Sequence, residues 1–395
     1  MVDKLPLSIM NQGKYVFTQV MEFLPRHHFN LCVKKYCGNR KIRKLSCFEQ
    51  FLAMSFGQLT HRESLRDIVG CLKAQSKKLY HLGFRNIVAK STLADSNNKR
   101  SWMIYRDFAE ILIKRARKLY AKDSSFSIDL KNTVYAFDSS TIDLCLKIFP
   151  WANFRKKKAG IKLHTLIDLR GNIPVFLEIT EAKISDVNIF DNIPIESGSF
   201  YILDRGYFST ERLNDINTLS AFFIIREKSG VLLKRIYSKT VEKSAGIRCD
   251  QTVKFVGELS HGGYPEKLRR IKYYDEETKK HYVFLTNNFS VEAKTIADLY
   301  KQRWQVELFF KWVKQHLKIK VFWGQSLNAV YTQIWIAVCA YLLVAILKKE
   351  LNILQSLNEI LQILSVSVFD RTALTSLFQN HDLQKNEPLS QKSLF

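Results

Sequence analysis

The sequence lacks the paired-cysteine spacing of a zinc-binding or redox-active site. It has seven cysteines among 395 residues, an odd number, and no two of them are separated by two residues. This pattern excludes the common zinc-ribbon and thiol-redox motifs. We therefore expect buried thiols at Cys32, Cys37, Cys47, Cys71, Cys145, Cys249 and Cys339.

The sequence also lacks a secretory leader and a clear membrane span. Its first residues, MVDKLPLSIMNQGKYVF, contain no basic region followed by an apolar run and a small-residue cleavage site, so we expect a cytoplasmic protein. The stretch from Ala329 to Leu347 has 19 residues without a charge, but Thr332 and Gln333 interrupt its first half. The 14-residue apolar run from Ile334 suits a buried core helix better than a bilayer crossing.

Acidic residues are scarce relative to basic ones. The chain has 61 Lys and Arg against 37 Asp and Glu, which gives a formal net charge of +24. This excess favours a polyanionic partner, with nucleic acid as the leading candidate. The alternative is a basic protein without such a partner, because net charge bears on association and not on fold.

Apolar periodicity divides the chain into helical and strand-rich parts. The first part follows the helical period, with capping-box patterns at Ser46 with Glu49 and at Thr60 with Glu63. After it, β-branched and aromatic runs such as NTVYAFD, IPVFLEIT and SFYILD indicate strands. The expected order is a helical domain over 1–125, an α/β core over 126–350 with a β-rich insertion at about 221–290, a helical segment over 351–380 and a disordered tail over 381–395.

Two of the expected strands end in a carboxylate. The run VYAFD ends at Asp138, and FYILD ends at Asp204. Carboxylates at the ends of hydrophobic strands lie at the rim of a sheet, where open α/β sheets commonly build ligand sites. Taken singly, each aspartate is explained as well by a turn or a helix cap.

A third carboxylate lies in the stretch YKQRWQVELFFKWVK, residues 300–314. At about 100° per residue, a helix would place Tyr300, Arg303, Glu307 and Lys314 within an arc of roughly 60°. This polar edge on an otherwise apolar helix is either part of a site or a solvated face with an Arg303–Glu307 pair. Three converging acids would suit Mg²⁺, which prefers oxygen ligands, and two such ions about 4 Å apart would serve phosphodiester chemistry.

These motifs resemble those of DDE transposases of the insertion-sequence-four type. Tyr300, Arg303, Glu307 and Lys314 match the Y-x2-R-x3-E-x6-K signature of that family. FDSST resembles the segment that carries its first aspartate, and LDRGYFS resembles the segment that carries its second. The resemblance covers roughly residues 133–346, and the helical part before it resembles the domain that precedes the catalytic core in some members.

The resemblance implies a fold and a mechanism. The fold is a ribonuclease-H-like mixed sheet interrupted by a β-rich insertion and preceded by a helical domain that is a candidate for binding DNA ends. Asp138, Asp204 and Glu307 would bind two Mg²⁺ ions, for which Mn²⁺ could substitute, cleave DNA at transposon ends and transfer it to a target. Tyr300, Arg303 and Lys314 would contact the DNA backbone. Partners would be the terminal inverted repeats, the target DNA and a second copy of the chain, with no membrane.

Four further features are candidates for DNA contact. Tyr282 could stack on a flipped base in a hairpin route, although an aromatic residue in a strand commonly packs in the core. Lys162 and His164 alternate onto one strand face and could lie near the metals, although a strand histidine is commonly only packed. The run NFRKKKAG, residues 153–160, could contact DNA or form a solvated loop.

Two other functions stay open at this point. One is a ribonuclease-H-like nuclease that hydrolyses DNA without strand transfer. The other is a DNA-binding regulator without catalysis, which would hold if the acids were structural. Terminal inverted repeats beside the gene and a strand-transfer assay with Mg²⁺ would distinguish them.

Overall fold

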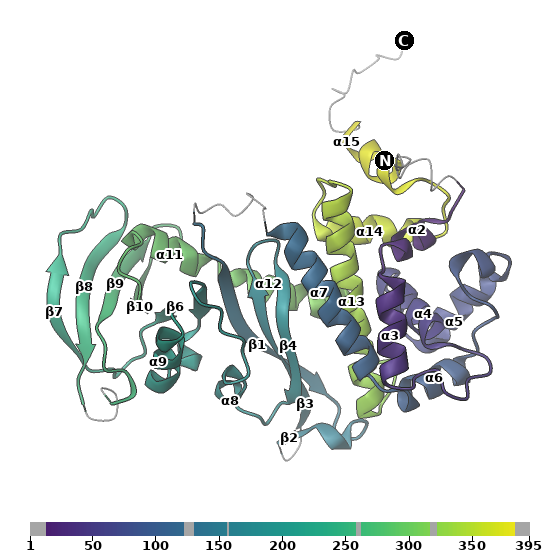
Figure 1. Ribbon diagram of the computed structural model, residues 1–395, viewed down its shortest axis with the longest axis horizontal. Coiled ribbons are helices and arrows are strands. Elements are labelled where there is room, and N and C mark those ends of the chain that lie inside the picture. The colour runs from purple at the N-terminus through teal and green to yellow at the C-terminus, as the bar shows by residue number, and fades with distance from the viewer. Residues whose placement is uncertain (1–12, 122–129, 156–157, 258–261, 317–321, 384–395) are drawn as a thin grey trace, which may run out of the picture. The chain divides into compact units, whose positions relative to one another are not determined.

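A computed structural model describes residues 13–121, 130–155, 158–257, 262–316 and 322–383 (Figure 1). The chain divides into two compact units. The first contains residues 1–119 and 312–395 and is helical, and the second contains residues 120–311 and is built on a sheet. The sequence predicts a disordered tail over residues 381–395. Residues 384–395 lie outside the described residues, and residues 381–383 end a helix.

The helical unit is formed by elements from both ends of the chain. Ser46 caps α4 in a capping box with Glu49, as predicted, because a side-chain oxygen of each accepts a hydrogen bond from the other's backbone amide. The second predicted box is wrong: Thr60 ends α4, and the next helix is capped instead by Ser64. Its helices are α2 (Val16–Glu22), α3 (Arg26–Lys35), α4 (Cys47–Leu59), α5 (Leu65–Ala74), η1 (Ser76–Lys78), η2 (Tyr80–Leu82), α6 (Lys90–Lys99), α7 (Met103–Tyr120), α13 (Leu327–Glu350), α14 (Leu357–Ser367) and α15 (Leu374–Leu383).

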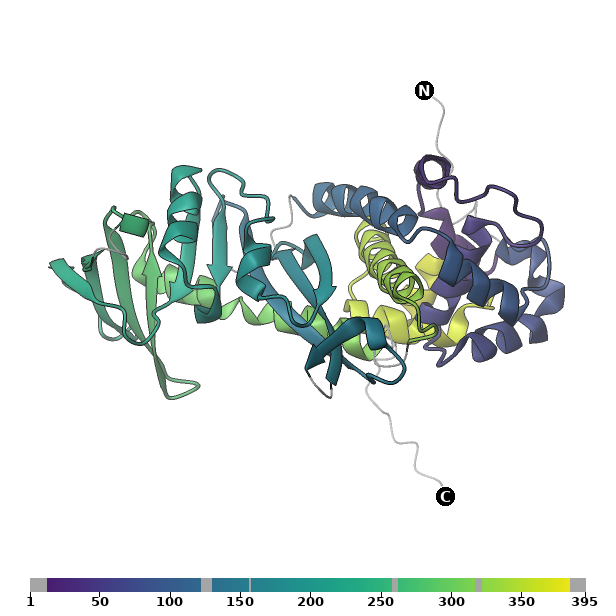
Figure 2. The same cartoon turned by 90° about the horizontal axis from the view of Figure 1, so that it is seen from below.

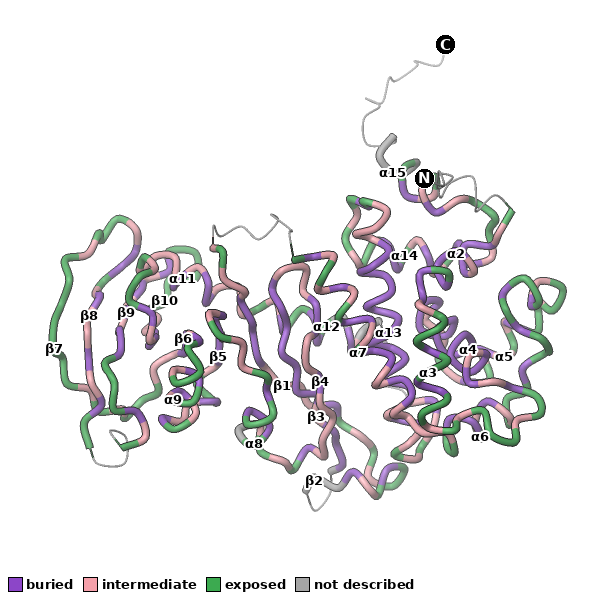
Figure 3. The backbone as a smooth tube through the Cα atoms, viewed as in Figure 1, coloured by how far each residue is buried: buried purple, intermediate pink, exposed green. Residues whose placement is uncertain are grey.

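The helix α13 is the core of this unit. Within the described part of the chain it is the one helix long and apolar enough to cross a membrane, and 94% of its apolar window is buried inside the protein. It packs against α4, α6 and α14, and Figure 3 shows its length as buried. Its burial by neighbouring helices matches the expected core helix. We had expected this segment within the α/β core, but its contacts place it in the helical unit.

The second unit is a ten-stranded mixed sheet with strand order β2-β3-β1-β5-β6-β10-β9-β8-β7, and β4 pairs with β3. At its centre, β1 pairs antiparallel with β3 and parallel with β5, and β5 pairs parallel with β6. The strands are β1 (Val134–Leu144), β2 (Asn153–Arg155), β3 (Lys158–Asp168), β4 (Ile173–Glu181), β5 (Phe200–Leu203), β6 (Phe222–Arg226), β7 (Leu233–Lys239), β8 (Ile247–Phe255), β9 (Leu268–Asp275) and β10 (Lys280–Thr286).

The β-rich stretch that we expected at 221–290 does not form a separate layer. Its first strand, β6, belongs to the parallel centre of the sheet, because its backbone pairs with β5. Strands β10, β9, β8 and β7 then continue the same sheet by antiparallel pairing, and Figure 1 shows them as its outer part. Four strands thus follow the central ones before the chain returns to helix.

Helices cover both faces of the central strands. Successive strand residues point to opposite faces, and Leu285 packs with Leu213 of α9 (Thr210–Thr218), whereas the ring of the adjacent Phe284 lies 4.7 Å from that of Tyr300 in α11 (Ala293–Lys301). The helices α9 and α11 therefore lie on opposite faces, as Figure 2 shows. The remaining helical elements of the unit are η3 (Pro150–Ala152), α8 (Asp186–Phe190), η4 (Arg205–Tyr207) and α12 (Trp304–His316), which continues past residue 311 into the first unit.

Candidate active site

Asp138 and Asp204 lie side by side on two central strands of the sheet, at the point where β5 ends. The parallel register of β1 and β5 pairs Phe137 with Leu203, so the two aspartates are the next residues along adjacent strands. Phe137 and Leu203 belong to the core on the α9 face. Because side chains alternate between faces, both aspartates point to the face that carries α11. The prediction that a strand ends at Asp138 is wrong, because β1 continues to Leu144, whereas β5 ends at Leu203, directly before Asp204.

The segment that we expected as a single helix over residues 300–314 is divided in two. The helix α11 ends at Lys301 and α12 begins at Trp304. Between them the amide of Arg303 donates to the carbonyl of Tyr300 at 3.0 Å, and the amide of Val306 donates to the carbonyl of Arg303 at 3.1 Å. These hydrogen bonds span three residues and not four, so a tighter turn separates the two helices. Tyr300 and Glu307 therefore come from different helices.

The turn brings Arg303 between two carboxylates. One guanidinium nitrogen lies 3.0 Å from Oδ2 of Asp138, and another lies 2.5 Å from Oε1 of Glu307. The side chains of Arg303 and Asp138 are largely buried, whereas that of Glu307 is 58% exposed. The hydroxyl of Tyr300 donates to Oδ1 of Asp204 at 3.5 Å. The structure thus links all three predicted acids through two side chains of the same segment.

The electrostatics of Asp138 show how closely the acids lie to one another. Burial raises the pKa of Asp138 to about 6, although the amide of Ser139 and the guanidinium of Arg303 lower it. The negative charges of Asp204 and Glu307 add to the increase in that pKa. Burial also raises the pKa of Tyr300, so its hydroxyl stays a hydrogen-bond donor near neutrality. A carboxyl with like charges beside it gains from a nearby cation.

The donor chemistry of the site suits a hard divalent cation, because all three acids offer carboxylate oxygens. Among the described residues, no group of three His, Cys, Asp or Glu side chains is close enough together to hold a metal as they stand. The guanidinium of Arg303 lies where it neutralises Asp138 and Glu307. The residues therefore fit a cation in type and neighbourhood, provided that Arg303 releases at least one carboxylate.

Lys162 and His164 do not join the three acids. The register pairs His164 with Ser139, the neighbour of Asp138, so its side chain lies on the opposite face of the sheet from that aspartate. Its Nε2 lies 2.8 Å from Oγ1 of Thr180, and its Nδ1 lies 3.6 Å from Oδ1 of Asp186.

The ammonium of Lys162 is also held at Asp186, 3.0 Å from its Oδ1, and donates to the carbonyl of Ile184 at 2.8 Å. The expectation that Lys162 and His164 lie near the metals is therefore replaced by a cluster around Asp186 at the start of α8. Burial lowers the pKa of His164 to about 4, so the imidazole is neutral in the folded protein near pH 7.

Tyr282 lines a cavity of about 390 Å³ beside the acids, on the α11 face of the sheet. The guanidinium carbon of Arg226 lies 5.2 Å from the centroid of its ring, and the ring of Phe284 is parallel to it at 6.1 Å. Tyr300 and Arg303 line the same cavity, as does Trp304, which is 48% exposed. An aromatic cavity with a guanidinium beside it suits a planar, electron-rich group.

Of the remaining predicted residues, Lys314 lies on α12 two turns beyond Glu307 and is half-buried. The run of residues 153–160 forms β2 and the start of β3, and residues 156–157 lie outside the described ones. The side chains of residues 153–158 lie outside the described ones, so a DNA contact of this run stays a prediction.

Comparison with known proteins shows the family of the chain. A family model described as a transposase DDE domain matches residues 129–343, more than half of the chain. The chain belongs to the DDE transposase family. A second family model, described as a domain of unknown function (DUF4372), matches residues 12–85 within the helical unit. Members of the DDE transposase family use divalent metal ions, in accord with the carboxylate chemistry of the site.

Three relatives carry the same assignment. A putative transposase, y4zB, of Sinorhizobium fredii is 32% identical over 74% of this chain and 78% of its own length. A probable transposase for insertion sequence element IS5377 of Geobacillus stearothermophilus is 27% identical over 67% of this chain and 69% of its own. A putative transposase for insertion sequence element IS4SA of Synechocystis is 23% identical over 65% and 71%.

Among solved structures, a piggyBac transposase in a synaptic complex with hairpin DNA covers 97% of this chain and 84% of that one. Its sequence identity to this chain is 12%, and the TM-score is 0.45.

In this DDE transposase the structure adds two residues to the predicted site, Trp304 and Arg226, which line the same cavity as Tyr300 and Arg303. Trp304 bordered the polar stripe, and its position in the helix did not reveal that it would be half-exposed beside a cavity. Arg226 ends β6, and its proximity to Tyr282 follows from the pairing of β6 with β10, which the sequence does not display. The sequence feature that could have identified Arg226 is its position as a charged residue at the end of an apolar strand.

Proposed function

We propose that this protein is a transposase of the insertion-sequence-four type that cleaves DNA at transposon ends and joins the freed ends to target DNA. The observation that carries the proposal is that Asp138 and Asp204 lie side by side on adjacent strands and that Arg303 joins Asp138 to Glu307. The Y-R-E-K signature supports this type: Tyr300 lies at the end of α11, Arg303 in the turn after it, and Glu307 and Lys314 on α12.

The central strands support a ribonuclease-H-like core. The order β4-β3-β1-β5-β6, with the first three strands antiparallel and the last two parallel to β1, is the arrangement that such a core requires. On this proposal, strands β7 to β10 are the β-rich insertion, entering after β6 and returning at α11. The helical domain at the N-terminus binds DNA ends, and two copies of the chain act together on two ends.

We assign the three acids to two Mg²⁺ ions, which Mn²⁺ could replace. Bound there, the ions would supply Lewis-acid activation of the attacking oxygen and stabilisation of the leaving one. Asp138 and Asp204 hold fixed positions because they extend rigid strands, whereas Glu307 is exposed on a helix and can adjust. The guanidinium of Arg303 holds positive charge at the place where the phosphate group must lie.

The DNA beside the cleaved bond would contact three residues that line one cavity, Tyr300, Tyr282 and Arg226. The hydroxyl of Tyr300 remains protonated and can donate to a phosphate oxygen once it leaves Asp204. The ring of Tyr282 offers a stacking surface for an unpaired base in a hairpin route, and Arg226 stays beside it. Lys314, two turns along α12, extends the same polar edge.

The test is a cleavage and strand-transfer assay on duplex DNA that carries the terminal inverted repeat, with Mg²⁺, Mn²⁺ or EDTA. We expect Asp138→Ala, Asp204→Ala and Glu307→Ala each to abolish cleavage while DNA binding persists. Asp143→Ala is the matched control, because Asp143 lies exposed on the same strand β1 and should leave cleavage unchanged. Cleavage without any joined product would indicate a nuclease, and unchanged cleavage in one of the three variants would remove that residue from the site.

A further inference from the structure

The loop between α3 and α4 is held firmly at both ends. At the end of α3 the amide of Gly38 donates to the carbonyl of Val33 at 2.9 Å, and the amide of Cys37 donates to that of Lys34 at 3.1 Å. Together with the positive φ of Cys37, this is a Schellman ending. At the other end Oδ1 of Asn39 accepts from the amide of Cys47 at 2.9 Å. The loop backbone therefore has a defined path.

The same loop packs closely on the helical core. A Cβ atom on Gly38 would lie 2.5 Å from Cδ1 of Ile104 and 2.8 Å from the sulfur of Cys47, so only glycine fits there. Beyond it, Arg100 ties the end of the loop to α4 by donating to Oε1 of Gln50 at 2.8 Å and to the carbonyl of Leu45. The loop thus forms one wall of a groove of about 510 Å³, whose other wall is the end of α6.

The groove is strongly and one-sidedly charged. Arg40, Lys41, Arg43 and Lys44 line it from the loop, and all four are exposed. Among the residues that the structure describes, none of the four forms an ion pair. The acid in the groove wall is Asp95, and it already lies 3.6 Å from the ammonium of Lys99, which belongs to the same wall. Cations held together without counter-charge repel one another and attract an anion.

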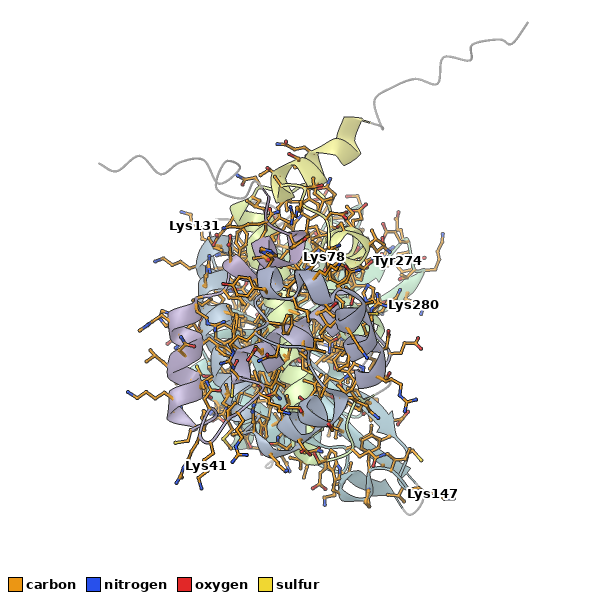
Figure 4. The ribbon with its side chains drawn as sticks, turned by 90° about the vertical axis from the view of Figure 1, so that its right-hand side faces the viewer. Lys41, Lys78, Lys131, Lys147, Tyr274 and Lys280 are labelled. Carbon is orange, nitrogen blue, oxygen red and sulfur yellow. The ribbon has the colours of Figure 1, made fainter. Side chains whose placement is uncertain are left out.

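The shape and side chains of the groove indicate a polymer and not a small ion. The cations follow one another along a fixed loop, and Figure 4 shows Lys41 extending outward from the helices. The side chains of Arg40 and Lys44 are likewise exposed, so the loop offers a run of exposed cations over residues 40–44 and not a closed cradle for one phosphate. A line of exposed cations matches the regularly spaced charges of a nucleic-acid backbone.

We propose that this groove, defined by Arg40, Lys41, Arg43, Lys44 and the end of α6, binds the phosphate backbone of duplex DNA. The proposal rests on the proposed function, since a transposase must hold DNA beyond its cleavage site. It assigns to the helical unit a site that is separate in sequence from the three acids. Phosphate contacts position DNA without reading its sequence, so the groove contributes affinity and register and no base specificity.

The experiment compares salt-dependent binding of the full-length protein to a fluorescent duplex of mixed sequence. The groove variant carries Arg40→Gln, Lys41→Asn, Arg43→Gln and Lys44→Gln. Asparagine is chosen at position 41 because φ of Lys41 is +57°, a conformation that asparagine tolerates. The control variant carries Arg66→Gln, Lys73→Gln, Lys77→Gln and Lys114→Gln, which removes the same charge from exposed positions of the unit outside the groove.

If each cation neutralises one phosphate, the groove variant loses about 3 to 4 from the slope of log K against log salt. Its affinity then falls about 100-fold less than that of the wild type between about 50 and about 200 mM salt, and its binding at low salt is correspondingly weaker. The control variant should keep the wild-type slope to within about 1. Thermal unfolding should be the same for all three proteins.

Equal slopes for the groove and control variants would overturn the proposal. The proposed function is tested separately, because Asp138→Ala should keep the wild-type salt slope while it abolishes cleavage. If the wild type fails to bind duplex DNA at all, both proposals fall. If the wild type binds DNA but the groove and control variants have the same slope, the proposal that the groove binds DNA is wrong and the proposed transposase function is unaffected.

Discussion

Folding of the sheet unit should weaken as the pH falls through the range in which His164 titrates. His164 is fully buried, and burial lowers the pKa of its imidazole to about 4. The charged groups that face it are Lys162, which lowers that pKa further, and Asp186, which raises it. An unfolded histidine has a pKa of about 6.5, so between about pH 6.5 and about pH 4 the unfolded chain binds a proton at this residue and the folded chain does not. The stabilisation is complete above pH 6.5 and is lost as the pH falls towards 4.

The size of the effect follows from the two pKa values. A difference of about 2.5 pH units corresponds to about 3.4 kcal/mol when the loss is complete. At about pH 5 the loss is already about 2 kcal/mol. Asp138 acts in the opposite direction, because its folded pKa of about 6 lies above the unfolded value and acid therefore stabilises the folded state through it. The wild-type curve alone thus mixes two opposed effects.

The assay is urea unfolding in EDTA at about pH 7.5 and about pH 5, performed on the wild type and on His164→Gln. Glutamine does not titrate and can still bond the hydroxyl of Thr180, so the difference between the two proteins isolates the imidazole. We expect the stability of the wild type relative to the variant to fall by about 2 kcal/mol at the lower pH. A difference that stays constant would refute the buried neutral imidazole, and a difference that grows at low pH would show that Asp186 outweighs burial.

Three further substitutions test packing and charge in other parts of the protein. In Gly57→Leu, the new Cβ would lie 2.5 Å from Cδ1 of Ile68 and 2.7 Å from a ring carbon of Trp323, so unfolding free energy measured in urea should fall by about 3 kcal/mol. In Arg269→Met, a buried aspartate loses both of its hydrogen bonds, at 2.9 and 2.7 Å, which should cost about 3 to 5 kcal/mol by the same measurement. In Arg303→Lys, one ammonium replaces a fork that reaches two carboxylates, and the DNA cleavage rate should fall about 100-fold.

Each substitution has its own control. Gly70→Leu is the match for the first, because a Cβ on Gly70 meets nothing within 4 Å, and an equal loss in both variants would contradict the packing argument. For the second, adding Asp250→Leu removes the unpaired carboxylate and should restore part of the stability; no restoration would mean that the buried charge is not the cause. For the third, unchanged cleavage in Arg303→Lys would show that a single positive charge suffices.

The parts of the site that depend on the local residue pattern of a strand could be predicted from the sequence. Asp138 and Asp204 follow buried, β-branched and aromatic runs, and two parallel neighbours then place them together. The capping box of Ser46 and Glu49 was also predictable, because its two hydrogen bonds are local. The capping box depends only on neighbouring residues, and the position of the two aspartates requires in addition that β1 and β5 are adjacent.

The parts that depend on long-range pairing could not be predicted. The helical period over residues 300–314 continues unbroken in the sequence, yet the chain turns at Arg303, where contact with Asp138 from a distant strand stabilises the turn. His164 was assigned to the metals because it shares a face with Lys162, but only the register against β1 decides which face that is. Asp186, which binds both side chains, carries no signal in the sequence beyond its charge.

The charge balance of the candidate site explains why it needs a cation from outside the chain. The carboxylates of Asp138 and Glu307 lie against the guanidinium of Arg303, and burial raises the pKa of Asp138, with the negative charges of Asp204 and Glu307 adding to the increase. A phosphodiester brought to this edge would add a further negative charge at close range. The acids therefore repel the proposed substrate until positive charge is supplied, whereas the net charge of +24 over the whole chain attracts DNA. It follows that DNA binding and DNA cleavage should respond to different perturbations: added salt weakens the first through surface cations such as Lys41, and chelation of divalent ions stops the second while the DNA stays bound.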